Sequence, residues 1–271
     1  MKRSLIVTPG ECLAERAEKH AGWLRQCVRP IFQAGFSGQL EGLGSCVLLK
    51  SKDRRCFVTA DHVIAANRPT LGSETSTLYF GPEDAGEVTQ LSGKALSALR
   101  YDVAIVFEAA GLNKLPEERF VSLNSHLFDS RQPPYRFCLV LGYRAARRAI
   151  NLNDLMLKAR PRLFIYVGTV QELTQTHLKI QIDYKKVRRG GRSHQTGELH
   201  GISGGGVFAF DPLNPNAVPL LVGVVTDHKK MERHLLCTRT TVIRQILLEA
   251  GAQLITHECD ALGSKVGPSV T

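Results

Sequence analysis

The sequence predicts an all-β protein built as a sandwich or a barrel. Most of the chain consists of short runs of β-branched, aromatic and other apolar residues, each bounded by turn-forming residues. Helical periodicity is confined to the two ends, so strands and helices do not alternate as a parallel α/β sheet requires. With 271 residues, 43% of them hydrophobic, the chain can bury a full core in one large domain or two lobes.

The predicted elements follow in chain order. Glu11 to about Phe32 is predicted to form an amphipathic helix, because its apolar residues recur every three or four positions, and Pro30 should end it. Two β-prone runs around the polar turn Ser51–Arg55 predict a hairpin. Thr240–Ala252 carries a second helical stripe. The predicted strands are Gly42–Lys50, Cys56–Thr59, Leu78–Phe80, Asp102–Phe107, Phe137–Leu141, Leu163–Val170, Leu178–Ile182, Val207–Phe210, Leu220–Thr226 and Leu235–Thr238.

No targeting or membrane segment is expected. The longest apolar runs have the length of a strand, and too few apolar residues follow the basic start for a signal peptide. The seven cysteines are odd in number and none has C-x-x-C spacing, which favours buried reduced thiols over disulfides or a structural zinc site. We therefore expect a cytoplasmic protein that uses no metal and no other cofactor.

Almost all of the net charge of +10 belongs to one segment. Arg144–Arg192 holds twelve lysines and arginines but three acids, a local excess of +9. Solvated loop charges are one interpretation, and recruitment of an acidic protein, a nucleic acid or an anionic surface is the other. Because Lys185–Arg192 has no interleaved aromatic residue, base stacking is not indicated. We favour an acidic partner over a nucleic acid and expect no membrane contact.

A glycine-rich turn, Gly201–Gly206, is the most informative stretch. Its four glycines surround one serine, Ser203, and an apolar run follows. Glycine permits positive φ and close approach to the backbone, so such a turn can present a hydroxyl together with backbone N–H groups. An acyl-transfer nucleophile with an oxyanion hole needs that arrangement. A flexible turn would have the same composition, so the interpretation depends on other residues.

Two further residues supply the chemistry that a serine nucleophile lacks. His62 follows a β-prone run, and Asp102 begins an otherwise apolar strand. Taken singly, a packed histidine and a turn-forming aspartate would explain them. Together they provide a base for the hydroxyl proton and an anion that holds the imidazole in one tautomer. We prefer Asp102 over Asp61, the direct neighbour of His62, because a carboxylate at a strand can be buried.

The order histidine, aspartate, serine is one of the chain orders known for such triads. The motifs Thr59–His62, Asp102–Val106 and Gly201–Gly205 resemble those of the trypsin- and chymotrypsin-like serine peptidases of the bacterial, cytoplasmic and disulfide-free type. The resemblance extends over about Gly35–Leu248. It implies two six-stranded antiparallel β-barrels, accompanied by the N-terminal and C-terminal helices, with the active site in the cleft between the barrels.

The resemblance also implies a role for each residue. Ser203 would be the nucleophile, His62 the general base and acid, and Asp102 its orienting partner. The backbone N–H groups of Gly201 and Ser203 would form the oxyanion hole. The chain would then divide into a helical extension over residues 1–34, a first lobe with His62 and Asp102 over 35–130, a second lobe with Ser203 and the C-terminal helix over 131–257, and a disordered tail over 258–271.

Three residues depart from the family pattern. Asp61 stands where the family has alanine and places a second carboxylate beside His62. Val63 replaces the cysteine with which secreted members form a disulfide. Ile202 replaces the aspartate that captures a new N-terminus during zymogen activation, so activation here cannot use that route.

The residues that bind substrate are expected before the turn and on the β-prone run that follows it. By analogy with the family, Gly197 forms the base of the pocket for the P1 side chain, and the later run pairs with an extended substrate backbone. Glu198 and Asp227 would favour a basic P1 side chain unless they face solvent, whereas Leu235 and Leu236 would favour an apolar one. The expected set is Gly197, Glu198, Thr226, Asp227 and His228.

The sequence therefore predicts a serine endopeptidase that hydrolyses peptide bonds through an acyl-enzyme. Two alternatives remain open. One is a peptide-binding pseudoprotease, or a latent protease that needs a partner to order the turn. The other is a basic nucleic-acid-binding β protein in which the three residues are incidental, although no standard nucleic-acid motif is present.

Overall fold

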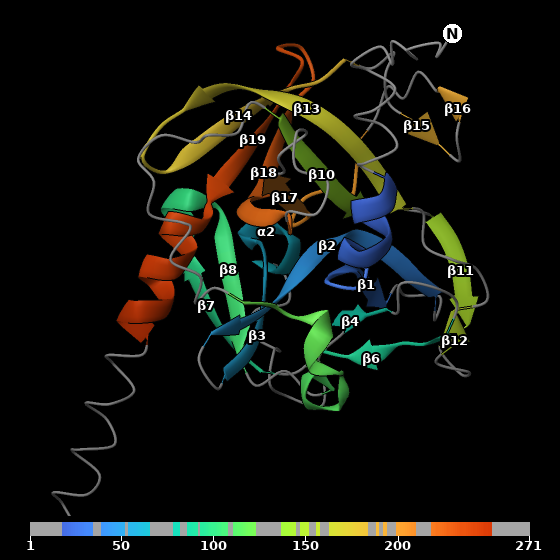
Figure 1. Cartoon of the computed structure of the whole chain (residues 1–271). Helices are drawn as coiled ribbons and strands as arrows, with labels where there is room; N and C mark the ends of the chain where they lie inside the picture. Colours follow the sequence, from blue (N-terminus) through green and yellow to red (C-terminus); the bar gives the residue numbers. More distant parts are fainter. Residues whose placement is uncertain are drawn as a thin grey trace, which may run out of the picture.

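Two β-sheets packed against each other, with helices at their edges, form the body of the protein (Figure 1). The all-β class predicted from the sequence is confirmed. The computed structural model describes residues 18–34, 39–51, 54–65, 78–81, 86–91, 93–107, 111–122, 137–144, 147–151, 156–157, 163–183, 188–189, 192–193, 199–209 and 218–250.

The first sheet is curled and mostly antiparallel. Its strand order is β6-β4-β1-β2-β3-β8-β7, and β9 and β11 pair with β2 beside this path. The β2–β3 pair is the predicted hairpin. β11 follows the predicted lobe boundary at residue 130 and yet pairs with β2, so the second half of the chain contributes to this sheet. The bounds are β1 (Val28–Ala34), β2 (Gln39–Ser51), β3 (Arg54–Ala60), β4 (Leu78–Phe80), β6 (Thr89–Gln90), β7 (Lys94–Ala98), β8 (Val103–Phe107), β9 (Val121–Ser122) and β11 (Arg147–Asn151).

The second sheet closes into a six-stranded antiparallel barrel. The order β10-β17-β18-β19-β14-β13 returns to its start because β10 also pairs with β13. Closure leaves these six strands without a free sheet edge along their paired residues. The bounds are β10 (Phe137–Tyr143), β13 (Leu163–Leu173), β14 (His177–Gln181), β17 (Gly206–Ala209), β18 (Leu220–Lys229) and β19 (His234–Arg239). The short strands β15 (Arg188–Arg189) and β16 (Arg192–Ser193) extend from β13, and β5 (Gly86–Glu87) pairs with β12 (Met156–Leu157).

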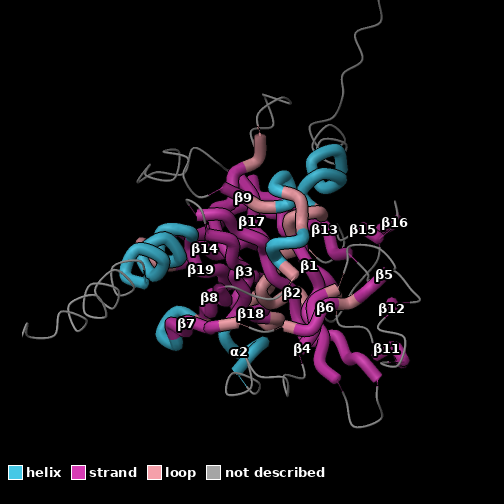
Figure 2. Tube along the Cα trace, turned by 90° about the horizontal axis from the view of Figure 1, so that it is seen from below, coloured by secondary structure: helices cyan, strands magenta, loops and turns pink. Residues whose placement is uncertain are grey.

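Helical turns lie mainly around the strands rather than among them (Figure 2). Residues 240–250 form the C-terminal helix that the sequence predicts, as far as the described residues reach. Residues 18–24 are helical near the start of the described chain. The short helices are α2 (Asp61–Ile64), η2 (Leu99–Tyr101), η3 (Leu112–Lys114) and η4 (Glu117–Arg119).

The N-terminal helix ends earlier than the sequence predicts. Val28–Ala34, which we expected to belong to the helical extension, form β1 between β2 and β4. Pro30 cannot occupy a helix interior without loss of a hydrogen bond. Val28 and Ile31 are fully buried in the sheet. The prediction for residues 28–34 is therefore wrong, because pairing with two strands outweighs the helical spacing.

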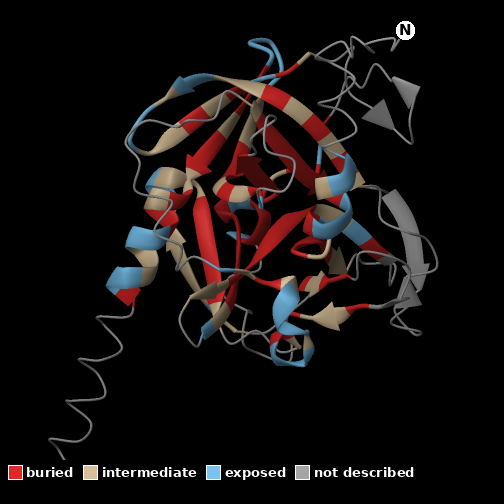
Figure 3. Ribbon diagram, in the orientation of Figure 1, coloured by how far each residue is buried: buried red, intermediate tan, exposed pale blue. Residues whose placement is uncertain are grey.

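Among the described residues the hydrophobic core has three large clusters, one within each sheet and one between the sheets, and a small fourth cluster of Phe32, Leu40 and Val88. Buried residues are concentrated on the central strands (red in Figure 3). The part between the sheets takes Val47 and Val58 from the first sheet and Leu139 and Phe208 from the second. Ile243 of the C-terminal helix packs into the same cluster. This shared cluster holds the two sheets together.

The cysteines behave as buried thiols where the structure describes them. Burial raises the pKa of three of them, Cys46, Cys56 and Cys138, to about 12, so they stay protonated. Cys12, Cys259 and the predicted tail lie outside the described residues. Within the described ranges no helix combines the length and the apolar character needed to cross a bilayer. The free, buried cysteines are Cys27, Cys46, Cys56, Cys138 and Cys237.

Phe208→Ala should lower the free energy of unfolding by about 3–5 kcal/mol, because it opens a cavity between the two sheets. Urea denaturation measures the change. Met231→Ala is the control, since Met231 is 94% exposed, and it should alter stability by less than about 0.5 kcal/mol. Equal losses in the two variants would contradict the position of the core.

Candidate active site

His62 and Asp102 meet in the first sheet, where β3 ends beside the start of its neighbour β8. β3 ends at Ala60, which pairs with Val103 at the start of β8. The chain continues from Ala60 directly into α2, so His62 lies beside the residue that precedes β8. The backbone N–H of Asp61 donates a hydrogen bond to the Asp102 carbonyl (3.0 Å). Strand pairing thus brings together two residues that are distant in sequence.

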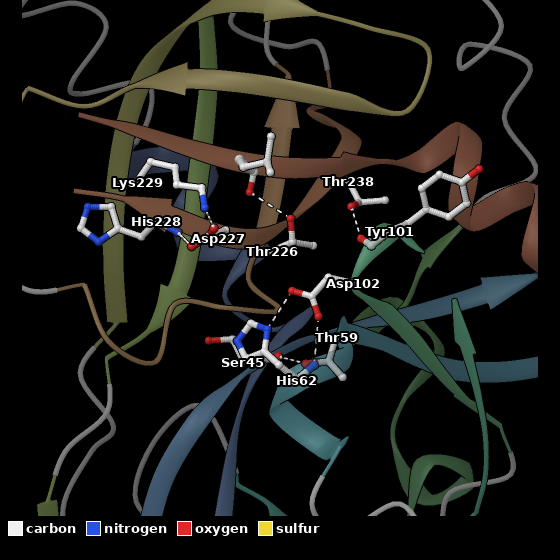
Figure 4. A network of polar contacts seen from close by, with 11 residues as sticks. Ser45, Thr59, His62, Tyr101, Asp102, Thr226, Asp227, His228, Lys229 and Thr238 are labelled. Carbon is white, nitrogen blue, oxygen red and sulfur yellow. Dashed lines mark hydrogen bonds and ion pairs between the residues drawn. The ribbon is translucent and has the colours of Figure 1, made fainter. Parts of the chain in front are cut away.

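The Asp102 carboxylate holds His62 with two hydrogen bonds (Figure 4). The His62 backbone N–H donates to Oδ1 (3.0 Å), and ring Nδ1 lies 2.7 Å from Oδ2. Because an ionised carboxylate only accepts, Nδ1 carries the proton, and Nε2 is the acceptor of the neutral imidazole. This is the tautomer that a general base for a hydroxyl needs.

Asp102 reaches this position through its backbone conformation. It has φ 49° and ψ 45°, in the left-handed region, where aspartate is one of the more tolerant residues. Asp102 lies just before β8, and its side chain is 37% exposed. Asp102 is therefore only partly buried, and Asp61 is the more deeply buried of the two acids. The hydrogen bonds nevertheless join His62 to Asp102, the residue preferred from the sequence.

The carboxylates around His62 raise the pKa of its imidazole. The hydrogen bond with Asp102 is the largest cause, and the charges of Asp102, Asp227 and Asp61 act in the same direction. Partial burial of the ring opposes them. His62 therefore accepts a proton more readily than an isolated histidine does.

The glycine-rich turn is packed tightly between the two sheets. Ser203 O accepts a hydrogen bond from Ser45 N (2.7 Å), and Gly204 N donates to Val225 O (2.7 Å). Gly204 has φ +84°, and a Cβ there would lie 1.8 Å from the Ser45 carbonyl oxygen. Only glycine fits this position without displacement of the first sheet.

Ser203 approaches the His62 segment but does not bond to it. The two segments meet at Gly44, where an added Cβ would lie 2.7 Å from Val63 Cγ2 and 2.9 Å from Ser203 O. Within the described part of the chain, the half-buried Ser203 has no hydrogen bond to its hydroxyl, from His62 or any other residue. Nucleophile and base are commonly farther apart without substrate than in the reacting complex.

The N–H groups of Gly201 and Ser203, expected to form the oxyanion hole, lie on this turn. Neither donates a hydrogen bond to another described residue. Gly201 has φ +89°, a second left-handed position that glycine permits. Because no described residue accepts a hydrogen bond from either N–H group, both can donate to an oxygen atom of a ligand.

Thr226, Asp227 and His228 lie on β18, next to the turn. A β-bulge between Val225 and Asp227 interrupts the register with β19, and the Thr226 hydroxyl donates to Leu236 O (3.2 Å). β17 pairs with β18 only as far as Val224. Beyond that residue, the edge of β18 opposite β19 pairs with no described strand.

Asp227 is close enough to His62 for each charge to affect the other's pKa. Partial burial acts to raise the pKa of Asp227, but the ion pair with Lys229 and the hydrogen bond from His228 N (2.6 Å) outweigh it, so this pKa lies below its usual value (Figure 4). The Asp227 carboxylate, which the sequence suggested as a partner for a basic substrate side chain, is therefore already paired with Lys229. Gly197 and Glu198 lie outside the described residues.

Two residues of the site are missed by the sequence analysis. The Thr238 hydroxyl of β19 donates to Tyr101 O (2.6 Å), directly before Asp102, and the Ser45 hydroxyl donates to Gly201 O (2.9 Å). Each partner is more than 130 residues away, at separations of 137 and 156, so no local pattern could have indicated them. Among the described His, Cys, Asp and Glu side chains, no three are arranged to hold a metal ion.

No protein-family profile and no curated protein sequence matches the chain. Among solved structures, the chain is similar to the inactivated protease paralogue S-I1 of the scabies mite, with a TM-score of 0.54 and 14% identity over 84% of this chain and 96% of that one. It also matches the serine endoprotease from Yersinia pestis, with a TM-score of 0.49 and 14% identity over 86% of this chain and 65% of that one.

The likeness to the mite protein concerns the fold. Together with the closed second sheet and the curled first sheet, it gives the chain a protease-like fold of the trypsin-like, two-barrel type.

Asp102→Asn should lower the pKa of His62, because the variant removes the charge that stabilises the imidazolium. Since the wild-type pKa is raised, acidification should protonate His62 at a higher pH than in the variant. NMR titration of the His62 ring measures both midpoints. Asp227→Asn should lower the pKa by less, because Asp227 acts through charge alone. Identical titrations of wild type and Asp102→Asn would contradict the geometry.

Gly204→Ala should destabilise the fold by more than about 1–2 kcal/mol, since a left-handed alanine and a clash with Ser45 add together. Gly22→Ala is the matched control: nothing lies within 4 Å of its added Cβ. In a helix this change should stabilise by about 0.5–1 kcal/mol. Thermal unfolding of both variants is the measurement, and a neutral Gly204→Ala would refute the packing of the turn.

Proposed function

We propose that this protein is a serine endopeptidase in which Ser203, His62 and Asp102 form the catalytic triad. The observation that carries the proposal is the pair of hydrogen bonds from His62 to the Asp102 carboxylate. They leave Nε2 as the free base, on the segment that meets the Ser203 turn at Gly44. The protease-like fold is consistent with this chemistry, but it is the site that argues for it.

The reaction follows from these groups. Ser203 Oγ bonds to the carbonyl carbon of the scissile peptide, and His62 Nε2 takes the hydroxyl proton. The carbonyl electron pair moves to oxygen, where the N–H groups of Gly201 and Ser203 stabilise the negative charge. When the C–N bond breaks, His62 returns its proton to the leaving nitrogen, and the acyl group stays on Ser203. Water then attacks the ester with His62 again as base, which releases the acid and restores the hydroxyl.

The unpaired edge of β18 is where we propose the substrate backbone binds. An extended peptide can add to a sheet edge through main-chain hydrogen bonds. The edge over Thr226–Lys229 has no described partner strand and begins directly after Val225, which bonds to the turn through Gly204 N and Gly205 O. A substrate peptide bound along this edge would have its scissile bond close to Ser203.

The preference for the P1 side chain follows from the pairing of Asp227. Because Lys229 neutralises that carboxylate, we propose that Asp227 does not act alone as a receptor for a basic P1 residue. Glu198, which lies outside the described residues, remains our candidate for that role. Leu235 is fully buried, so we propose that it can contribute only to the wall of the pocket for the P1 side chain.

A latent enzyme or peptide-binding pseudoprotease is the second candidate. It is favoured by one observation: no hydrogen bond joins the Ser203 hydroxyl to His62 within the described residues. The mite protein of similar fold is itself named as an inactivated protease. Under this alternative, wild type would bind peptides at β18 without cleavage, and Ser203→Ala would bind them equally well.

We also propose a cellular location and a kind of partner. Five of the cysteines are buried free thiols, as in proteins of the reducing cytoplasm, and we propose that location. The basic segment Arg144–Arg192 is proposed as the contact for an acidic partner, since it carries nearly all of the net charge.

Ser203→Ala should reduce peptide cleavage by at least about 10³-fold, because it removes the nucleophile. Wild type and variant are each incubated with a peptide library, and the products are identified by mass spectrometry, which also gives the P1 preference. Equal thermal unfolding of the two proteins is the control for folding. Equal cleavage by the two proteins, or none by either, would count against the enzyme.

A further inference from the structure

Ser45 of β2 makes an unusual set of contacts with the glycine-rich turn. It is fully buried and belongs to the first sheet, whereas the turn belongs to the second. Its backbone N–H donates to Ser203 O (2.7 Å), and its hydroxyl donates to Gly201 O (2.9 Å). One residue thus bonds to carbonyl groups on both sides of Ile202.

The direction of the Ser45 hydroxyl is fixed by a third contact. The backbone N–H of Tyr143, on β10, donates to Ser45 Oγ (2.7 Å). An N–H can only donate, so the oxygen accepts there and its single proton is directed to Gly201 O. The carbonyl of Ser45 accepts a hydrogen bond from Thr59 Oγ1 (2.7 Å). Every polar group of Ser45 is therefore used, and together they join the glycine-rich turn to β3 and β10.

These bonds determine where the N–H of Ser203 points. The carbonyls of Gly201 and Ser203 are held by Ser45, and the intervening carbonyl of Ile202 accepts from Gly205 N (2.8 Å). The described peptide bonds are trans, so the N–H of Ser203 is directed opposite to the Ile202 carbonyl. The carbonyl faces into the turn, and the N–H therefore faces out of it.

We propose that Ser45 is a positioning residue that keeps the oxyanion-binding N–H groups aligned, acting from the first sheet on a turn of the second. This proposal rests on the proposed function. Ser45 does not touch the substrate: it acts through Gly201 and Ser203. Replacement by alanine removes both hydroxyl bonds and leaves a buried carbonyl and a buried N–H without that partner. The turn can then rotate away from its aligned conformation.

The test compares Ser45→Ala with Ser97→Ala. Ser97 is a serine of β7 whose hydroxyl oxygen is buried and has no hydrogen-bond partner among the described residues, so the same change removes no bond there. In Ser45→Ala, kcat should fall about 10- to 100-fold with KM unchanged, because a misplaced donor weakens transition-state binding. The pH profile should be unchanged, since Ser45 has no hydrogen bond to His62 or Asp102. Ser97→Ala should match wild type.

Hydrogen exchange, measured by mass spectrometry, provides a readout independent of activity. Peptides that cover Gly201–Gly206 should exchange faster in Ser45→Ala than in wild type or Ser97→Ala. If wild type cleaves no peptide, the proposed function fails, and the exchange rates alone decide whether Ser45 holds the turn. Unchanged exchange in folded Ser45→Ala, or an equal fall of kcat in both variants, would overturn the proposal.

Ser45→Cys covers the case in which Ser45→Ala does not fold. The thiol has nearly the size of the hydroxyl but is a weak donor and acceptor. We expect folded Ser45→Cys to have a kcat below wild type and faster exchange over the turn. Wild-type kcat and exchange in this variant would equally overturn the proposal.

Discussion

The contact between the two sheets is the constraint on which the candidate site depends. His62 and Asp102 come from the first sheet and Ser203 from the second, so neither sheet carries all three. Side-chain hydroxyls donate across the boundary from both sides: Thr238 of the second sheet bonds to Tyr101 O beside Asp102, and Ser45 of the first bonds to Gly201 O in the turn. The shared apolar cluster provides the cohesion, and these directional bonds determine the alignment.

The local charge of the site is opposite in sign to that of the whole chain. The protein carries a net charge of +10, yet three carboxylates, those of Asp61, Asp102 and Asp227, raise the pKa of His62. Such surroundings stabilise an imidazolium at the moment when it forms. Lys229 balances one of the three acids. The site therefore favours a positive charge on His62, although the chain as a whole is basic.

The sequence was sufficient for features that depend on local pattern. The hairpin of β2 and β3 and the strand β4 follow from short β-prone runs bounded by turn-forming residues. The pair of His62 and Asp102 follows from residue types that are diagnostic in combination. The sequence was insufficient where contacts between distant parts of the chain determine the local structure. Val28–Ala34 form a strand because β2 and β4 flank them. Asp102 is only partly buried because it adopts a left-handed conformation just before β8. The bonds of Ser45 and Thr238 depend on tertiary packing alone.

Covalent labelling of the protein is the sharpest test of whether Ser203 is a nucleophile that His62 activates. Wild-type protein is treated with a fluorophosphonate, digested, and the modified peptide sequenced by tandem mass spectrometry. We expect one adduct, on the Ser203 oxygen, that forms more slowly as acidification protonates His62. An unmodified Ser203, or an adduct that forms at the same rate after His62→Ala, would contradict it.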